Sequence, residues 1–219
     1  MRSVSHCQFT GSGVIAHAED EKGVQHRVFL QDARAGVSFP TGGLPGYYVL
    51  IGRQFDTIST GKAKLLYLCE GEDIMHEPLF QSLTDACTKF KCRTLYAHLP
   101  RVDRRGGIGG YDDLWRYLRN KRLGINMMPA PAAEDEDYGK ALIREYIKDR
   151  AIDVPEYEDN PTILRGQLRE ITEDGDAKHL YAFHALRLVI AGFVKFNQGI
   201  PYSPETRKSS AKANPKGWT

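Results

Sequence analysis

Residues 46–52, Gly-Tyr-Tyr-Val-Leu-Ile-Gly, are the stretch that decides the fold of this sequence. They form a short, continuous apolar run of β-favouring residues between two glycines. Such a run predicts a strand that is buried on both of its faces. We therefore expect the body of the protein to start at Gly46.

Strands and helices alternate along the chain after this first run. Residues 63–70 predict a second strand, joined to the first by a short turn, so the pair is expected to form an antiparallel hairpin. Later strands are expected at 93–99, at 125–130 and briefly at 152–155. Apolar spacing and capping residues predict helices at about 78–90, 112–123, 138–147, 160–171 and 177–196. This alternation predicts an α/β domain of three layers with a mixed sheet, in which the crossovers add parallel strands.

The two ends of the chain differ from this body. Residues 1–45 predict a β-ribbon, with extended runs at 14–18 and 24–30 around a hairpin loop. The basic tail contains too little apolar surface to fold alone. The expected organisation is an N-terminal β-ribbon extension at 1–45, the α/β domain at 46–197 and a basic, flexible tail at 198–219.

Composition excludes several classes of protein. The chain has 219 residues and a formal net charge of +2, so no global field directs it to nucleic acid or a membrane, and a polyanion would have to meet a local patch. No signal peptide is recognised, and the apolar stretch 180–194 is too short and too polar to span a bilayer. The four cysteines lack a secreted framework spacing, which favours a reducing cytosol.

Two possible sites of chemistry have weak support in the sequence. Cys87, Cys92 and His98, with His76 nearby, fit none of the usual zinc spacings, so a structural role of the cysteines is favoured. The glycine-rich run 106–110 precedes a helix and either holds a phosphate on its backbone amides or forms a flexible loop. Neither a P-loop nor a nucleophile elbow occurs in the sequence.

A local excess of positive charge lies between residues 101 and 122. It either follows a nucleic-acid backbone without reading the base sequence or is a solvated helix face. The candidate nucleic-acid-binding residues are Arg101, Arg104, Arg105, Arg116, Arg119, Lys121 and Arg122.

Three acids are candidates for a metal-dependent nuclease. A two-metal nuclease needs several carboxylates that converge at strand ends around Mg²⁺ or Mn²⁺. Asp56 follows the first predicted strand, Glu70 ends the second, and Asp176 precedes the last helix. Acids in such places occur in many α/β domains, so the constellation is a weak signal. These three acids are the catalytic candidates for the case in which the protein is active.

The order of elements from Gly46 to about Phe196 resembles the C-terminal nuclease domain of phage terminase large subunits, which has a ribonuclease H-like fold. The likeness is clearest at the end, in the strand at 151–155, the helix at 160–171 and the helical sequence at 179–186. The run 48–52 is similar to that family's first strand. The resemblance implies a ribonuclease H-like α/β fold, a phage or prophage origin, a location in the host cytoplasm or the virion, and a role in DNA packaging or virion assembly.

The sequence departs from the resemblance where the family binds its metals. Gln54 or a near neighbour replaces the first Asp, Ala97 and His98 stand at the second acid, and Leu180 and Tyr181 replace the paired acids of the last helix. Amide, imidazole and apolar groups do not supply the charge that two hard cations need.

We therefore expect a catalytically inactive protein that binds DNA or a packaging or virion protein, with no cofactor and no membrane partner. The alternatives are an active Mg²⁺- or Mn²⁺-dependent endonuclease and a structural virion assembly protein without nucleic-acid contact.

Overall fold

A computed structural model of the chain describes residues 3–20, 22–58, 61–98, 110–129, 136–154, 163–172 and 181–197. The strands are β1 (Ser3–Phe9), β2 (Val14–Glu19), β3 (Gln25–Ser38), β4 (Gly46–Thr57), β5 (Ala63–Asp73), β6 (Thr94–Ala97), β7 (Asn126–Pro129) and β8 (Ile152–Asp153). The helices are α1 (His76–Lys89), α2 (Gly110–Asn120), α3 (Glu136–Lys148), α4 (Ile163–Thr172) and α5 (Tyr181–Asn197).

All of these strands belong to one mixed sheet. The main order is β1-β2-β3-β4-β5-β8, and β6 and β7 continue the sheet on the β2 side of β3. The pairs from β1 to β5 are antiparallel, as the predicted hairpin at 46–70 required, whereas β3–β6, β6–β7 and β5–β8 are parallel. The sheet is therefore mixed, as the sequence predicts.

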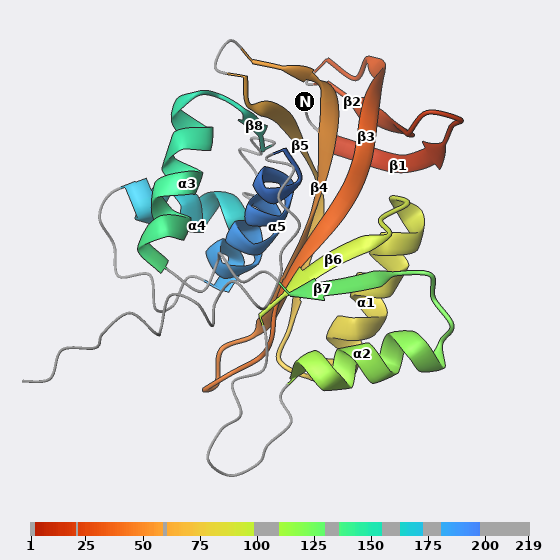
Figure 1. Ribbon diagram of the computed structural model, residues 1–219, viewed down its shortest axis with the longest axis vertical. Coiled ribbons are helices and arrows are strands. Elements are labelled where there is room, and N and C mark those ends of the chain that lie inside the picture. Colours follow the sequence, from red (N-terminus) through yellow and green to blue (C-terminus); the bar gives the residue numbers. More distant parts are fainter. Residues whose placement is uncertain are drawn as a thin grey trace, which may run out of the picture.

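Helices cover both faces of the central strands (Figure 1). On one face α3, α4 and α5 pack on alternate residues of β4 and β5, and on the other α1 and α2 pack on the residues between them. This is why the run Tyr47–Ile51 is buried on both sides. The predicted α/β class with a mixed sheet between helical layers is confirmed.

The last helix is central to one of these layers. In α5, Phe183, Leu186, Val189 and Phe193 are fully buried, as expected for a helix that is apolar nearly all round. Within the described part of the chain, no helix combines the length and the apolar character needed to cross a membrane.

Strand β3 is longer and more central than the sequence predicts. Its first half pairs with β2, and Arg34–Val37 in its second half pair in parallel with β6. The connection to β4 therefore starts only after Ser38. The boundary expected at residue 45 falls between the paired strands β3 and β4, so the ribbon and the α/β body share β3.

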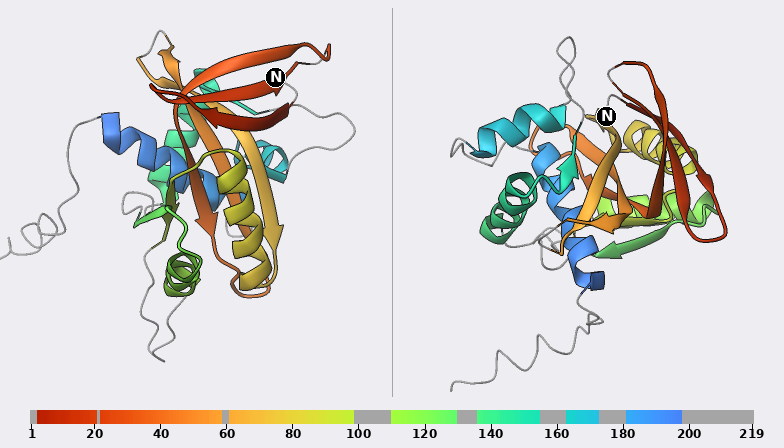
Figure 2. Two further views of the ribbon diagram at one scale, coloured as in Figure 1. Left: turned by 90° about the vertical axis from the view of Figure 1, so that its right-hand side faces the viewer. Right: turned by 90° about the horizontal axis from the view of Figure 1, so that it is seen from above.

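The ribbon formed by β1, β2 and the start of β3 bends across the α1 side of the sheet (Figure 2). Val4, Cys7 and Ala16 on its inner face are buried in the same apolar cluster as Phe90 and Cys92 at the end of α1. The ribbon thus contributes to the core of the body and is not an independent unit of packing.

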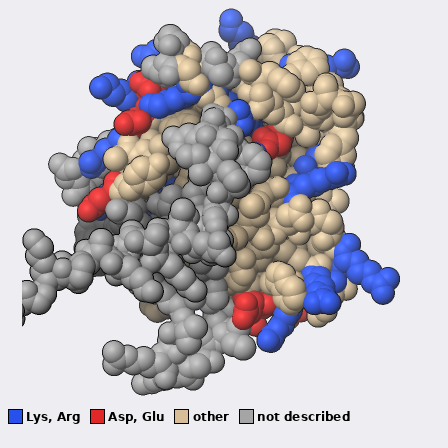
Figure 3. All heavy atoms as spheres, viewed as in Figure 1, with Lys and Arg blue, Asp and Glu red and all other residues tan. Residues whose placement is uncertain are grey.

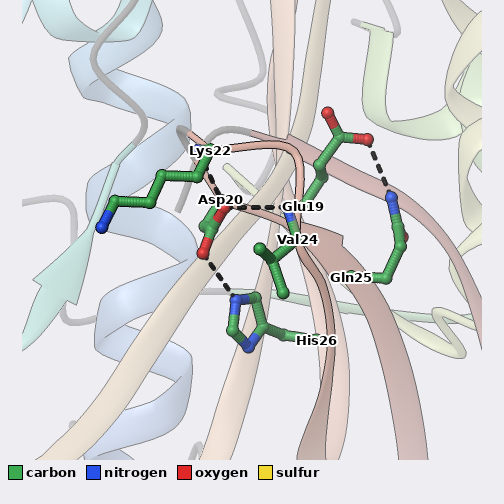
Figure 4. A network of polar contacts seen from close by, with 6 residues as sticks. All are labelled: Glu19, Asp20, Lys22, Val24, Gln25 and His26. Atoms are coloured by element: carbon green, nitrogen blue, oxygen red, sulfur yellow. Dashed lines mark hydrogen bonds and ion pairs between the residues drawn. The ribbon is translucent and has the colours of Figure 1, made fainter.

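The β2–β3 turn is held by one aspartate (Figure 4). Oδ1 of Asp20 accepts hydrogen bonds from the backbone N–H groups of Lys22 and Val24 at 2.8 and 2.9 Å, and Oδ2 lies 2.8 Å from Nε2 of His26. Gly23 adopts a φ of 79°, which a residue without Cβ accommodates at no steric cost. These contacts lower the pKa of Asp20, with the His26 hydrogen bond as the largest cause.

Candidate functional site

The carboxyl ends of the parallel strands are the first place to look for a site, because ligands of open α/β sheets bind there. Strands β3, β5, β6 and β7 run in the same direction, so their carboxyl ends lie along one edge of the sheet. Described residues at or just beyond these ends are Ser38, Asp73, His98 and Pro129, and Glu70 lies three residues before the end of β5.

Helix α5 lies directly on the central strand at this edge. A Cβ atom built on Gly36 of β3 would come within 2.0 Å of the Ala185 carbonyl oxygen of α5 and 3.2 Å of the Val189 nitrogen. Only glycine allows this approach of helix to strand. The α5 face of β3 is therefore filled by backbone at Gly36, and it leaves no room for a side chain that could hold a metal ion there.

Buried cations occupy the space beside this contact. The Arg34 guanidinium of β3 donates hydrogen bonds to the hydroxyl of Tyr96 and the carbonyl of Gly192, both at 3.1 Å. It also forms an ion pair with Asp32 at 2.6 Å, and it lies over the ring of Phe193. Burial is the largest cause that raises the pKa of the Tyr96 phenol.

A second buried arginine lies at the end of β6. Arg187 of α5 donates a hydrogen bond from Nη2 to Nε2 of His98 at 3.1 Å. The described polar side chains that meet at the end of β6 are therefore an imidazole and a guanidinium. Neither is a ligand suited to Mg²⁺ or Mn²⁺, which prefer oxygen.

Glu70 lies near the carboxyl edge of the sheet, but its carboxylate is used to cap a helix. Its carboxylate accepts a hydrogen bond from the Tyr47 hydroxyl, and it accepts the backbone N–H groups of Ile163 and Leu164 at 2.8 and 3.3 Å. It therefore caps the N-terminus of α4, whose first N–H groups have no partner within the helix. Burial, and next the charge of Glu70, raise the pKa of Tyr47, which keeps this phenol a donor.

The three predicted catalytic acids are not brought together by the described chain. Glu70 pairs with Val49 on β4, and Asp56 lies seven residues further along β4, or about 23 Å at the rise of a strand. Glu70 is also three strands, or about 14 Å, from β6. Asp176 lies outside the described residues.

Asp56 and Glu70 therefore do not form a two-metal site in the part of the chain that the structure describes. The metals of a two-metal site are about 4 Å apart and share their carboxylates, which acids this far apart cannot do. In the described ranges, no group of three His, Cys, Asp or Glu side chains is placed to hold a metal ion.

The two cysteines considered for a zinc site, Cys87 and Cys92, are buried in an apolar cluster. Cys7, Cys69, Cys87 and Cys92 are free thiols on the α1 side of the sheet, and three of the four are buried. Burial raises the pKa of Cys7 to about 12, and a hydrogen bond with Cys92 together with burial raises that of Cys87. Such thiols are poor ligands and nucleophiles at neutral pH.

The predicted basic cluster falls partly on α2. Arg116 and Arg119 are exposed on this helix, and Lys121 and Arg122 follow it. Arg119 lies over the ring of Trp115 at 5.2 Å. Arg101, Arg104, Arg105 and the glycine run 106–109 lie outside the described residues. We call Arg116, Arg119, Lys121 and Arg122 the α2 basic surface.

Sequence reasoning missed three further cations beside this surface. Lys89 ends α1, Lys91 and Arg93 lie in the connection from α1 to β6, and Lys121 and Arg122 lie in the connection from α2 to β7. The parallel pairing of β6 with β7 brings the two connections together, and the Asn126 N–H donates to the Arg93 carbonyl at 2.7 Å. Figure 3 shows Lys and Arg side chains along the margin of the molecule that carries α2.

No acid offsets these seven cations within their own segments. Residues 86–98 and 114–129 contain no Asp or Glu. Of the residues whose side chains are described, none forms an ion pair with Lys89, Lys91, Arg93 or the α2 basic surface. The signal is present in the sequence as Lys-Phe-Lys-Cys-Arg, but its proximity to residues 121–122 depends on the strand pairing.

Comparison with known proteins finds similarity of structure but not of sequence. Neither a family model nor a curated protein matches the chain. The large terminase nuclease of thermophilic phage G20c, crystallised with bound zinc, aligns at 14% identity and a TM-score of 0.47, covering 85% of this chain and 91% of that one.

Two resolvase structures are also similar. RuvC of Thermus thermophilus aligns at 7% identity and a TM-score of 0.48, covering 76% of this chain and 96% of that one. The Holliday junction resolvase of fowlpox virus aligns at 11% identity and a TM-score of 0.39, covering 77% and 99%. These likenesses concern the fold and carry no information on the activity of this chain.

The α/β part of the expected fold class, with its mixed central sheet, is confirmed by the sheet topology. One detail of the sequence resemblance needs correction. The run 48–52 lies in β4, which has antiparallel neighbours on both sides. The strand that begins the parallel part of the sheet is β3, because it pairs with β6 through a crossover.

Proposed function

We propose that this protein is a catalytically inactive, terminase nuclease-like protein that binds the phosphate backbone of nucleic acid through the α2 basic surface. The observation that carries the proposal is the tract of exposed cations from Arg116 to Arg122, which contains no acid. Lysine and arginine side chains without an acidic partner are available to phosphate oxygens, and such contacts supply affinity without reading sequence.

The inactive part of the proposal is supported by the geometry at the carboxyl edge. Gly36 lies against the backbone of α5, Asp32 is paired with the buried Arg34, Arg187 donates to His98, and Glu70 caps α4. A nuclease would need negative charge at this edge to hold its metals. The role in DNA packaging or virion assembly of a phage rests on the sequence resemblance, as does a location in the host cytoplasm or the virion.

The test measures binding of a fluorescent 30-base-pair DNA by anisotropy at several salt concentrations. The variant carries Arg116→Ala, Arg119→Ala and Lys121→Ala. Its matched control carries Lys22→Ala, Arg27→Ala and Lys148→Ala, which remove the same charge from exposed positions elsewhere. If three phosphate contacts are lost, the slope of log K against log salt falls by about 2.7, and affinity at 50 mM salt falls at least about tenfold.

The control variant is expected to keep a slope close to that of the wild type. Equal weakening in both variants would mean that net charge alone attracts DNA, and the proposed surface would be wrong. Absence of DNA binding by the wild type would refute the function. Manganese-dependent cleavage of the DNA would refute the inactive part and favour the nuclease alternative.

A further inference from the structure

A groove lies next to the α2 basic surface, at the amino ends of β6 and β7. It has a volume of about 470 Å³, and its lining includes Phe9 of the ribbon, Lys91 and Arg93 before β6, and Leu123–Asn126 before β7. Three segments far apart in the sequence therefore meet around one opening. We call it the ribbon groove.

The ribbon groove is positively charged and continues the α2 basic surface. Lys91 and Arg93 lie on one side of it, and Lys121 and Arg122 directly precede the residues that line the other side. Among the described residues, the only other ionisable groups that line the groove are the buried thiols Cys87 and Cys92. The potential inside therefore favours an anion that enters from the α2 side.

An aromatic ring is exposed at the far end of this path. The Phe9 side chain is 50% exposed, and the Arg93 guanidinium lies 4.3 Å from the centre of its ring. Trp115 of α2 is 46% exposed beneath Arg119. The ribbon groove and the α2 basic surface thus each carry an exposed ring with an arginine stacked on it.

This combination fits a single strand of nucleic acid better than a duplex. Proteins that bind single strands join a basic groove, which follows the phosphates, to aromatic side chains on which unpaired bases stack. A duplex offers phosphates but keeps its base faces stacked inside the helix. Cations alone would serve either form, whereas an exposed ring inside the groove has a partner only when bases are unpaired.

We infer that the ribbon groove binds single-stranded nucleic acid, with Phe9 as a stacking platform for a base and Lys91 and Arg93 as phosphate contacts. This inference rests on the proposed function, because it names the form of nucleic acid that the basic surface prefers. The strand passes Lys121 and Arg122 and reaches Phe9.

The test compares three labelled ligands at equal salt by anisotropy: a 20-nucleotide oligo(dT), a 20-nucleotide oligo(U) and a 20-base-pair duplex. The wild type is expected to bind a single strand more tightly than the duplex, and the tighter of the two single strands identifies DNA or RNA. Phe9→Ala is expected to lower single-strand affinity by about 5- to 100-fold and to leave the salt slope unchanged.

The matched control is Phe29→Ala, since Phe29 is 59% exposed on the same ribbon but does not line this groove. Thermal unfolding of both variants verifies that the ribbon is intact. A second variant, Lys91→Ala with Arg93→Ala, is expected to reduce the slope for single strands by about 1.4.

Three outcomes would overturn the inference. Equal or tighter binding of the duplex would do so, as would a Phe9→Ala variant that binds like the wild type, and both would leave the proposed function standing. Absence of binding to all three ligands would instead remove the proposed function, and the inference with it.

Discussion

The two ends of the parallel strands in this protein are built in opposite ways. At the carboxyl ends, where α/β sheets hold their ligands, α5 touches β3 at Gly36, and buried Arg34 and Arg187 make hydrogen bonds within the protein. At the amino ends of β6 and β7, a groove lies open, and its cations have no described acid beside them.

This difference shows that close packing can occupy the place where sheets of this kind usually bind ligands. Close packing at the carboxyl edge stabilises the sheet, because it buries the apolar side chains of α5 against β3 and β4. The same packing fills the space into which a side chain at position 36 of β3 would project. Function then has to be sought from local chemistry rather than from the architecture.

The largest effect is expected from a substitution that disrupts the packing of α5 on β3 at the carboxyl edge. Gly36→Val places side-chain atoms where the Ala185 carbonyl lies, so either α5 must move away from β3 or the strand must distort. We expect a loss of about 3 kcal/mol or more in the free energy of unfolding, measured by urea denaturation.

Gly166 provides the matched control for this change. It lies in α4, and a Cβ atom added there would have no other atom within 4 Å, so Gly166→Ala is expected to raise stability by up to about 1 kcal/mol. A Gly36→Val protein as stable as the wild type would show that α5 is not seated on β3, and the carboxyl edge would then be open to a ligand.

A smaller effect is expected at Glu70, which distinguishes a capping role from a catalytic one. Glu70→Ala leaves the Tyr47 hydroxyl and two backbone N–H groups of α4 without their acceptor. We expect a loss of about 1–3 kcal/mol in the free energy of unfolding, with unchanged DNA binding. Glu70→Gln keeps one acceptor oxygen and should lose less.

Glu72→Ala supplies the comparison for Glu70→Ala, because Glu72 lies two residues further along β5 and hydrogen-bonds the side chain of Tyr181 instead of backbone N–H groups of α4. A Glu70→Ala variant of unchanged stability would contradict the capping role. It would also return this acid to the set of catalytic candidates.

The smallest effect is expected at Asp20, and it tests how the β2–β3 turn of the ribbon is held. Hydrogen bonds hold the pKa of Asp20 below its ordinary value of 3.8, so the folded state favours the carboxylate. A lowered folded pKa gives stability that is complete above the ordinary value and is lost as the pH falls through the folded value. Asp20→Asn should therefore destabilise the protein slightly at pH 7, while the difference from the wild type shrinks at pH 3.

Unfolding curves of the two proteins at both pH values measure this effect. A gap between wild type and Asp20→Asn that is as large at pH 3 as at pH 7 would mean that the charge of Asp20 does not hold the turn. The ribbon would then depend on its apolar inner face alone.

Local patterns in the sequence predict most of the elements correctly. The apolar run at 46–52, the amphipathic spacing after Pro78 and the apolar helix near the end each identify an element that the structure contains. The sequence predicts strand β3 too short because residues 31–36, Gln-Asp-Ala-Arg-Ala-Gly, lack strand-favouring side chains. Their extended conformation depends on pairing with β6 and contact with α5, which are tertiary effects.

The candidate site is less predictable than the fold. The α2 basic surface can be identified because its residues are close in sequence. Phe9, Arg93 and Lys121 come from three distant segments, and only the bend of the ribbon and the β6–β7 pairing bring them together. Asp56 and Glu70 become joint candidates in the sequence because both follow strands, but β4 and β5 run in opposite directions.

The most direct test of binding without cleavage is one incubation of the wild-type protein with a labelled oligo(dT) strand and Mn²⁺. Anisotropy reports whether the strand is bound, and a denaturing gel of the same sample reports its length. We predict that the anisotropy stays high and that the strand keeps its full length. Shortened strands that appear only with Mn²⁺ would contradict the account, because they would require a metal site that the described residues do not form.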